Sequence, residues 1–306
     1  MSPVTRSPRG GAAAPLVGAL GDLIEDLVVE LGGPIRPRTD TEAVITRRRG
    51  GSAANVAVAA VLAGGRGRFL GNVGGDHLAD SLLAGLTSAG VEAVVTRSGR
   101  TGTVIAVIDA DGERSLLTDR GSAGELAELP AGALDGLGVL HVPAYAFGVE
   151  PLGGTARRAL TEAHRAGILT SVDASAVPVI EQMGPEGFRR MLMETTPDVL
   201  LCNEDEARAL GVEEPPLGVG LTIVKRGPEP ALILVGDGPV EEVPAREVTG
   251  VVDTTGAGDA FAAGALVALG SGRSPRQAVE LGHLLGAAAV SVAGALAGTE
   301  SVPGVT

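Results

Sequence analysis

Short runs of apolar residues, many of them β-branched, alternate along the chain with longer segments rich in Ala and Leu. The first part reads PLVGAL, SAANVAVAAVLAG, RFLGNV and DHLADSLLAGLTSAG, in that order. Short buried runs separated by helical periodicity are typical of βαβ units on a parallel sheet covered by helices. The pattern returns with GVLHV, ILTSVD, DVLLC and LTIVK. We therefore predict an α/β fold with one doubly wound, mostly parallel, Rossmann-like sheet.

Two stretches interrupt this alternation, at about residues 27–48 and 103–118. Each contains strand-like runs that meet at turn signals such as Asp111-Gly112. Two hairpins inserted early in an α/β chain can form a small separate sheet that covers a pocket as a lid. No linker or internal repeat divides the chain further, so we predict one domain over residues 1–306 that carries this lid. Its exposed strand edges favour a homodimer through the lid.

Composition narrows the class of protein. The 306 residues are 44% hydrophobic and 20% charged, as in a globular protein, and the net charge of −13 argues against a nucleic-acid partner. A single cysteine excludes an internal disulfide, and four scattered histidines show no metal-ligand spacing. No export signal is evident, and the apolar stretch at 284–297 is shorter than the roughly 20 residues that span a bilayer. These features predict a cytoplasmic protein without a membrane partner.

The segment Asp253-Thr254-Thr255-Gly256-Ala257-Gly258-Asp259 precedes the helical pattern AFAAGALVALG. Backbone amides where a loop enters a helix form a concavity suited to phosphate oxygens, and the small residues 256–258 let a ligand approach closely. Asp259 in the first helical turn could then accept the proton of an attacking hydroxyl. The alternative is an ordinary glycine turn with an Asp favoured by the helix dipole. The Walker A and protein-kinase motifs are missing.

DTTGAGDAFAAGAL resembles the C-terminal signature of the ribokinase-like, or PfkB, carbohydrate kinases. The N-terminal signature of that family is matched by GGSAANVA from Gly50 and by GNVGGD from Gly71. Together the matches extend over nearly the whole chain. The resemblance implies a ribokinase-like fold and an ATP-dependent kinase, with an anion hole at Gly256, Ala257 and Gly258 and Asp259 as the catalytic base.

On the substrate side, the resemblance implies contacts from Asp26, Gly50, Gly51 and Asn55, with Asp22 as the second candidate for the role of Asp26. A carboxylate and an amide suit vicinal hydroxyls because each takes part in two hydrogen bonds at a fixed spacing. Ribose kinases carry Asn at the position of Ile24 and Lys at the position of Ser52, which argues against ribose itself.

The resemblance also implies a nucleotide site. It matches Asn203 and Glu206 to a motif that organises Mg²⁺ and its waters around the phosphates, although the same pair would also cap the helix EDEARAL. It places Lys225, Gly227 and His283 near the nucleotide; a surface lysine and a packed histidine are the alternatives. Pro230 stands where the family usually has a second glycine. Asp253 matches a residue beside which some relatives bind K⁺.

Three functions remain open after this reading. The first is an ATP-dependent kinase that phosphorylates a hydroxyl of a sugar or sugar derivative. The second is a nucleoside kinase of the same family, for which Tyr145, Phe147 and Phe69 are the few aromatic candidates to stack on a base. The third is a sugar-binding or regulatory protein without catalysis, against which the intact base, anion hole and metal motif argue.

Overall fold

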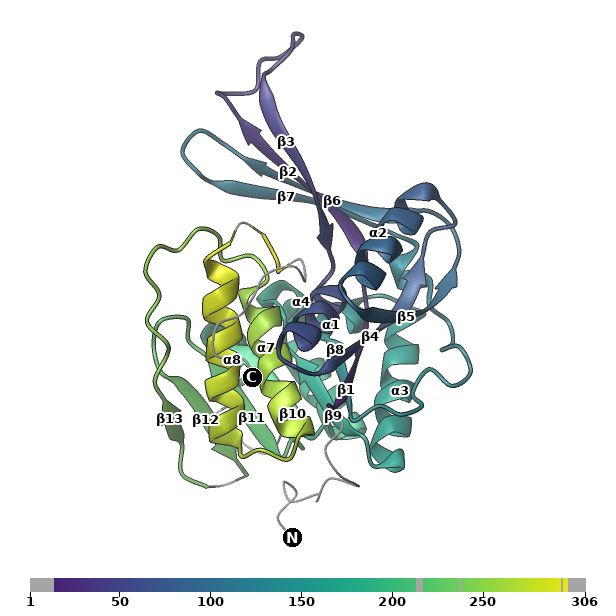
Figure 1. Ribbon diagram of the computed structural model, residues 1–306, viewed down its shortest axis with the longest axis vertical. Helices are drawn as coiled ribbons and strands as arrows, with labels where there is room; N and C mark the ends of the chain where they lie inside the picture. The colour runs from purple at the N-terminus through teal and green to yellow at the C-terminus, as the bar shows by residue number, and fades with distance from the viewer. Residues whose placement is uncertain (1–13, 213–216, 237, 293, 297–306) are drawn as a thin grey trace.

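The computed structural model describes residues 14–212, 217–236, 238–292 and 294–296. Within these residues, nine strands form one large sheet in the order β13-β12-β11-β10-β9-β8-β1-β4-β5 (Figure 1). All neighbours pair in parallel except β11 with β12 and β12 with β13. The strands are β1 Leu16–Leu20, β4 Arg66–Val73, β5 Val91–Arg97, β8 Val139–Pro143, β9 Leu169–Asp173, β10 Val199–Asn203, β11 Leu221–Lys225, β12 Ala231–Val235 and β13 Glu241–Val243.

Helices cover both faces of this sheet and bury an apolar core on each. One core contains side chains of α1, α2, α7 and α8, and the other contains side chains of α3, α4, α5 and α6. The helices are α1 Ser52–Leu62, α2 His77–Ser88, α3 Leu152–Ala166, α4 Val177–Met183, α5 Pro185–Thr195, α6 Glu204–Leu210, α7 Ala257–Gly270 and α8 Pro275–Val290, with short 3₁₀ turns η1 Ser122–Glu125 and η2 Ala144–Gly148. The predicted doubly wound fold is confirmed.

Period-two alternation along β1 explains how one strand serves both cores. Val17 and Ala19 belong to the core with α1 and α7, whereas Leu16 and Leu20 belong to the opposite core. Successive side chains on a strand point to opposite faces, so a strand covered on both sides is apolar throughout. All five residues of β1 are buried.

Residues 260–268 of α7 are all buried, because α1, α8 and β1 pack around this helix. Glycines let the two helices approach: a Cβ on Gly264 would lie 2.7 Å from the carbonyl oxygen of Leu281, and one on Gly282 would lie 3.0 Å from that of Phe261. Figure 1 shows the two helices side by side in front of the sheet. This packing holds the N-terminus of α7, with its glycine-rich entry, in a defined place.

The two predicted hairpins form a second, four-stranded sheet in the order β3-β2-β6-β7, which we call the lid. Its strands are β2 Ile24–Leu31, β3 Ala43–Gly50, β6 Thr101–Ile108 and β7 Arg114–Gly121. The hairpins β2-β3 and β6-β7 are antiparallel and join through the parallel pair β2-β6. The strands run a few residues beyond the predicted 27–48 and 103–118, because pairing continues to Gly50 and Gly121.

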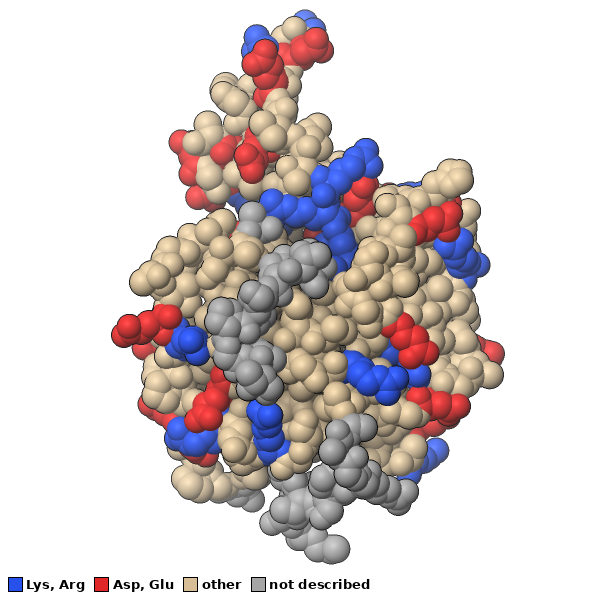
Figure 2. All heavy atoms as spheres, in the orientation of Figure 1, with Lys and Arg blue, Asp and Glu red and all other residues tan. Residues whose placement is uncertain are grey.

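The lid projects from the main body at the end where α1 and α7 begin (Figure 1). Figure 2 shows Lys and Arg atoms gathered at the base of the lid, where it meets the main body. No helix among the described residues is both long and apolar enough to cross a bilayer.

Candidate functional site

The candidate site lies between the base of the lid, the N-terminus of α7 and the carboxyl ends of β9, β10 and β11. Asp173, Asn203 and Lys225 are the last residues of these three strands. In open α/β sheets, ligands bind in the crevice outside the carboxyl ends of the strands. The glycine-rich entry to α7 lies beside these strand ends, because a Cβ built on Gly258 would lie 3.5 Å from Lys225 Nζ.

The entry to α7 has the backbone that a phosphate-binding turn requires. Gly256 is the N-cap with φ of 74°, a left-handed conformation that glycine adopts without strain. A Cβ there would also lie 2.7 Å from the Cβ of Ala295. Ala257 donates its amide to the carbonyl of Thr254 at 3.2 Å, which closes the turn. The first amides of a helix have no intrahelical partner and carry partial positive charge, so this end of α7 attracts an anion.

Asp259 is held in place by two side chains of α1. Ser52 Oγ donates to Asp259 Oδ1 at 2.6 Å, and Asn55 Nδ2 donates to Oδ2 at 3.0 Å. Burial raises the pKa of Asp259 to about 6, although both hydrogen bonds and Lys225 oppose the rise. A carboxyl group with this pKa is ionised at neutral pH and still basic enough to accept a proton.

Lys225 forms a buried ion pair with Asp173. Its Nζ lies 2.6 Å from Asp173 Oδ2, and the two side chains are 15% and 8% exposed. Burial alone would lower the pKa of Lys225, but Asp173 and Glu206 raise it above the ordinary value, so the ammonium stays charged. Lys225 is therefore not the exposed strand-end lysine that was the alternative. It places a fixed positive charge beside the first turn of α7.

Asn203 and Glu206 form the capping box that the sequence allows. Glu206 N donates to Asn203 Oδ1 at 2.9 Å, and Glu206 Oε2 accepts from Asn203 N at 2.8 Å. Glu206 is buried, and burial together with the nearby charge of Asp173 raises the pKa of its carboxyl. The cap is thus present, and the same carboxylate lies in the charged cluster at the strand ends.

The predicted substrate residues meet at the base of the lid. A Cβ on Gly50 would lie 2.2 Å from Asp26 Oδ1, and one on Gly51, whose φ is 99°, would lie 2.1 Å from the carbonyl oxygen of Asp22. The two glycines therefore let the Asp26 side chain and the backbone of Asp22 pass close to the segment that leads into α1. Burial raises the pKa of Asp26, with Arg114, Arg48 and Arg49 opposing the rise.

Asp22 has a buried oxygen without a partner. Among the described residues Asp22 Oδ1 has no hydrogen bond, and Oδ2 lies 3.4 Å from Arg120 Nη1. Burial raises the pKa of this carboxyl, and Arg120 lowers it only in part. Buried carboxylate oxygens are normally hydrogen-bonded, so an unpartnered one at the base of the lid points to a ligand donor. The guanidinium of Arg120 in turn lies 5.3 Å from the centroid of the Tyr145 ring.

The other two predicted nucleotide residues are Gly227 and His283. Gly227 sits in the turn after β11 with φ of 57°, and a Cβ there would meet nothing within 4 Å. The ring of His283 packs edge-on against Phe261 at 5.2 Å, and its Nε2 lies 3.3 Å from the carbonyl oxygen of Val243. Their contact with a nucleotide stays a prediction.

Asp253 is surrounded by donors. Its Oδ1 accepts from Thr255 N at 2.9 Å and from Thr255 Oγ1 at 2.6 Å, and its Oδ2 accepts from Gly294 N at 2.8 Å. Arg48 from the lid approaches the same Oδ2 at 3.5 Å. No group of three or more His, Cys, Asp or Glu side chains in the described part of the chain is arranged to hold a metal ion.

Sequence reasoning missed three participants in the site: Ser52, Asp173 and Arg48. Asp173 could have been found, since it ends a buried run in ILTSVD and polar residues at the carboxyl ends of parallel strands are typical of ligand sites. Ser52 and Arg48 act across long sequence separations, for which no local pattern exists.

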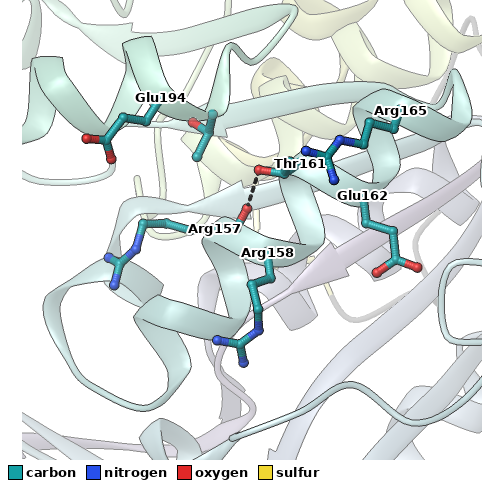
Figure 3. A pocket seen from close by; sticks show the side chains of 7 residues that line it. Arg157, Arg158, Thr161, Glu162, Arg165 and Glu194 are labelled. Atoms are coloured by element: carbon teal, nitrogen blue, oxygen red, sulfur yellow. Dashed lines mark hydrogen bonds between the residues drawn. The ribbon is translucent and has the colours of Figure 1, made fainter.

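A separate surface pocket lies between α3 and α5 and contains none of these residues. Figure 3 shows arginine and glutamate side chains around it, with Thr161 bonded to the carbonyl of Arg157. Its lining residues are Arg157, Arg158, Thr161, Glu162, Arg165, Glu194 and Thr195.

Comparison with solved structures matches this fold over most of the chain. The adenosine kinase of Sinorhizobium meliloti superposes with a TM-score of 0.80 at 24% identity, covering 92% of this chain and 95% of that one. A fructokinase of Xylella fastidiosa with bound ATP superposes with a TM-score of 0.75 at 21% identity, covering 92% and 93%. These likenesses show the ribokinase-like fold.

Sequence comparison shows the family. The chain is 30% identical to the fructokinase of Escherichia coli, over 92% of this chain and 94% of that protein. It is 29% identical to probable fructokinase-7 of Arabidopsis thaliana, over 95% and 91%. The model of the pfkB family carbohydrate kinases matches residues 15–301. The chain therefore belongs to the pfkB family of carbohydrate kinases, phosphotransferases that act on an alcohol group.

Proposed function

We propose that this protein transfers the γ-phosphate of ATP to a hydroxyl of a sugar or sugar derivative, with Asp259 as the base. The observation that carries the proposal is the environment of Asp259, which combines a pKa of about 6 with a place in the first turn of α7 and two hydrogen bonds from α1. Asp259 accepts the proton of the sugar hydroxyl while the hydroxyl oxygen forms a bond to the γ-phosphorus. The bond to the β-phosphate oxygen then breaks, and ADP leaves.

On the phosphate side, the turn at Gly256, Ala257 and Gly258 forms the anion hole with the dipole of α7; the amide of Ala257 closes this turn on Thr254, and those of Gly256 and Gly258 bind the phosphate. Charge developing on the transferred group is stabilised there without reorganisation of the protein. The ammonium of Lys225, fixed by Asp173, adds a positive charge next to Gly258. ATP as the donor is supported by the bound nucleotide of the Xylella fructokinase.

The residues at the strand ends fit Mg²⁺ bound with the nucleotide. Lys225 Nζ pairs with Asp173, and the charges of Glu206 and Asp259 also raise the pKa of Lys225, so these carboxylates outnumber the ammonium and a further cation would balance them. Glu206 would hold Mg²⁺ through water molecules, in keeping with the preference of this ion for oxygen ligands and retained waters. When bound, the ion neutralises charge on the phosphate oxygens.

Potassium at Asp253 does not fit, because Arg48, Gly294 and Thr255 already engage that carboxylate.

A sugar is favoured as the acceptor over a nucleoside. The unpartnered Asp22 Oδ1 and the neighbouring carboxylate of Asp26 suit hydroxyl donors. The Arg120 guanidinium already lies over the ring of Tyr145, the aromatic side chain near them, so this ring is not free to stack on a base. Relatives named as fructokinases support a hexose such as fructose. The nucleoside alternative rests on the likeness to an adenosine kinase, at an identity that concerns the fold.

We further propose a homodimer that forms through the lid. Strand register places Leu27, Val29, Ile45, Ile105, Val107 and Leu117 on one face of it. Ile45 is 62% exposed and Leu117 is 60% exposed. Arg47, paired with Glu25, lies on the same face beside Leu27. An exposed apolar cluster with a charged edge on a projecting sheet is a typical interaction surface, and a two-fold axis would pair the face with itself.

A panel of acceptors tests the proposed function. Purified protein with ATP and Mg²⁺ is incubated with fructose, glucose, ribose, adenosine and inosine, and acceptor-dependent ADP release is measured. We expect release with a sugar and little with the nucleosides. Release with adenosine or inosine and none with any sugar would instead support the nucleoside kinase.

A further inference from the structure

Arginines of the lid reach across to the segments that support the anion hole. Arg48 Nη1 on β3 lies 3.5 Å from Asp253 Oδ2, and Arg49 Nη2 on the same strand donates to the carbonyl oxygen of Leu296 at 2.6 Å. Arg114 Nη1 on β7 donates to Thr255 Oγ1 at 3.1 Å. Lid strands therefore bring positive charge to both the loop before α7 and the segment after α8.

The backbone at Gly294 makes room for the guanidinium of Arg48. A Cβ at this position would lie 2.4 Å from Arg48 Nη1 and 2.9 Å from Arg48 Cδ, and its φ of 80° is one that other residues rarely adopt. The amide of Gly294 meanwhile donates to Asp253 Oδ2. Arg48 thus packs on Gly294 and ends on the carboxylate that Gly294 and Thr255 hold.

A carboxylate with nearby carbonyl oxygens is the type of donor set that also holds a hard cation. Here the carboxylate of Asp253 faces Arg48 and the carbonyl of Leu296 accepts from Arg49. The positive charge that balances Asp253 therefore comes from an arginine side chain of the protein and not from a bound ion. Side chains of the lid therefore occupy the surroundings of Asp253, the residue matched to the one beside which some relatives bind K⁺.

We propose that Arg48, assisted by Arg49, replaces a monovalent cation as the positive charge that orders the entry to α7, so that catalysis is independent of K⁺. This inference rests on the proposed kinase function. Arg48 acts as a positioning residue, through Asp253 and the turn at Thr255 and Gly256. In the register of the lid, Arg48 is the partner of Asp26, so one pair of strands carries both the sugar contact and the charge that supports the phosphate site.

Monovalent-cation dependence tests this inference directly. Activity is measured with tetramethylammonium salts of ATP and buffer, with and without added KCl, for the wild type and for Arg48→Met. The wild type should keep its turnover number within about twofold, whereas Arg48→Met should lose at least about tenfold without K⁺ and regain much of it with K⁺ but not Li⁺. Arg48→Lys should keep an intermediate rate without K⁺. Arg47→Met is the matched control, because Arg47 pairs with Glu25 within the lid, and it should behave as the wild type.

A binding readout separates this inference from the proposed function. The midpoint of thermal unfolding of Arg48→Met should rise with KCl relative to LiCl at equal ionic strength, and that of the wild type should not. A wild type that needs K⁺ for activity or is selectively stabilised by it would overturn the inference. So would full activity of Arg48→Met in the absence of K⁺. Absence of acceptor-dependent ADP release would contradict the proposed function alone, since the thermal comparison needs no turnover.

Discussion

Ser52 Oγ donates a hydrogen bond of 2.6 Å to Asp259 Oδ1, although the two residues are 207 positions apart. The bond joins the first residue of α1 to the first turn of α7. Hydrogen bonds to the ionised form of a carboxyl group lower its pKa, and burial raises it. The basicity of Asp259 is therefore set by a balance between its burial and a serine near the N-terminal end of the chain.

Replacement of Ser52 by Ala tests this balance. Since the kinase needs ionised Asp259, we expect kcat/KM of the wild type to rise with pH through about 6 and then level off. Ser52→Ala removes a bond that lowers the pKa of Asp259, so the rise should move to higher pH. Ser271→Ala, at the other end of α7, is the control and should leave the profile unchanged. An unshifted profile in Ser52→Ala would refute the balance.

Asp22→Asn tests the role of the unpartnered buried oxygen. A hydrogen bond from a substrate hydroxyl to a charged acceptor is worth roughly 1.5–3 kcal/mol, so KM for the sugar should rise by about tenfold or more. Because burial raises the pKa of Asp22, the neutral amide should not lower the midpoint of thermal unfolding. Asp119→Asn changes an exposed lid carboxylate that pairs with Arg100 and serves as the control. An unchanged KM in Asp22→Asn would show that Oδ1 meets no substrate.

Glu206→Gln tests the proposed Mg²⁺ contact. Glutamine at this position can still form the capping box, so the fold should keep its thermal stability. Loss of the carboxylate charge should raise the Mg²⁺ concentration needed for half-maximal activity by about tenfold. Asp205→Asn removes an exposed charge from the same helical turn and should leave the Mg²⁺ dependence as it is. Equal dependence in Glu206→Gln and the wild type would mean that Glu206 is a helix cap and nothing more.

A pair of adjacent substitutions tests the lid dimer. Ile45 lies on the apolar face, and Val44, which is 63% exposed, lies on the opposite face. Light scattering after size exclusion should give a dimer for the wild type and for Val44→Glu, and a monomer for Ile45→Glu. A monomeric wild type, or dissociation by both substitutions alike, would contradict the proposed face.

Much of the fold could be predicted from the sequence because its determinants are local. Alternation of buried strands and helices predicted the large sheet, and turn signals such as Asp111-Gly112 predicted the lid hairpins. The glycine-rich entry to α7 could be recognised because the requirement for a positive φ at Gly256 leaves a mark in sequence.

The rest of the site depends on contacts between distant segments. The pairs Ser52 with Asp259, Asp173 with Lys225 and Arg48 with Asp253 arise only when α1, the strand ends and the lid are assembled. The spacing of residues along the chain does not predict such pairs. The pKa of Asp259 could not be predicted either, since it depends on burial and on charges from several elements.

The central claim, that Asp259 is the base of a sugar kinase, is tested most directly by the turnover number of Asp259→Asn with the best acceptor of the panel. We expect kcat to fall by at least about 10³-fold while the sugar still shifts the thermal midpoint as it does in the wild type. Asp111→Asn, at an exposed turn of the lid, should keep full turnover. A kcat of Asp259→Asn near that of the wild type would contradict the assignment.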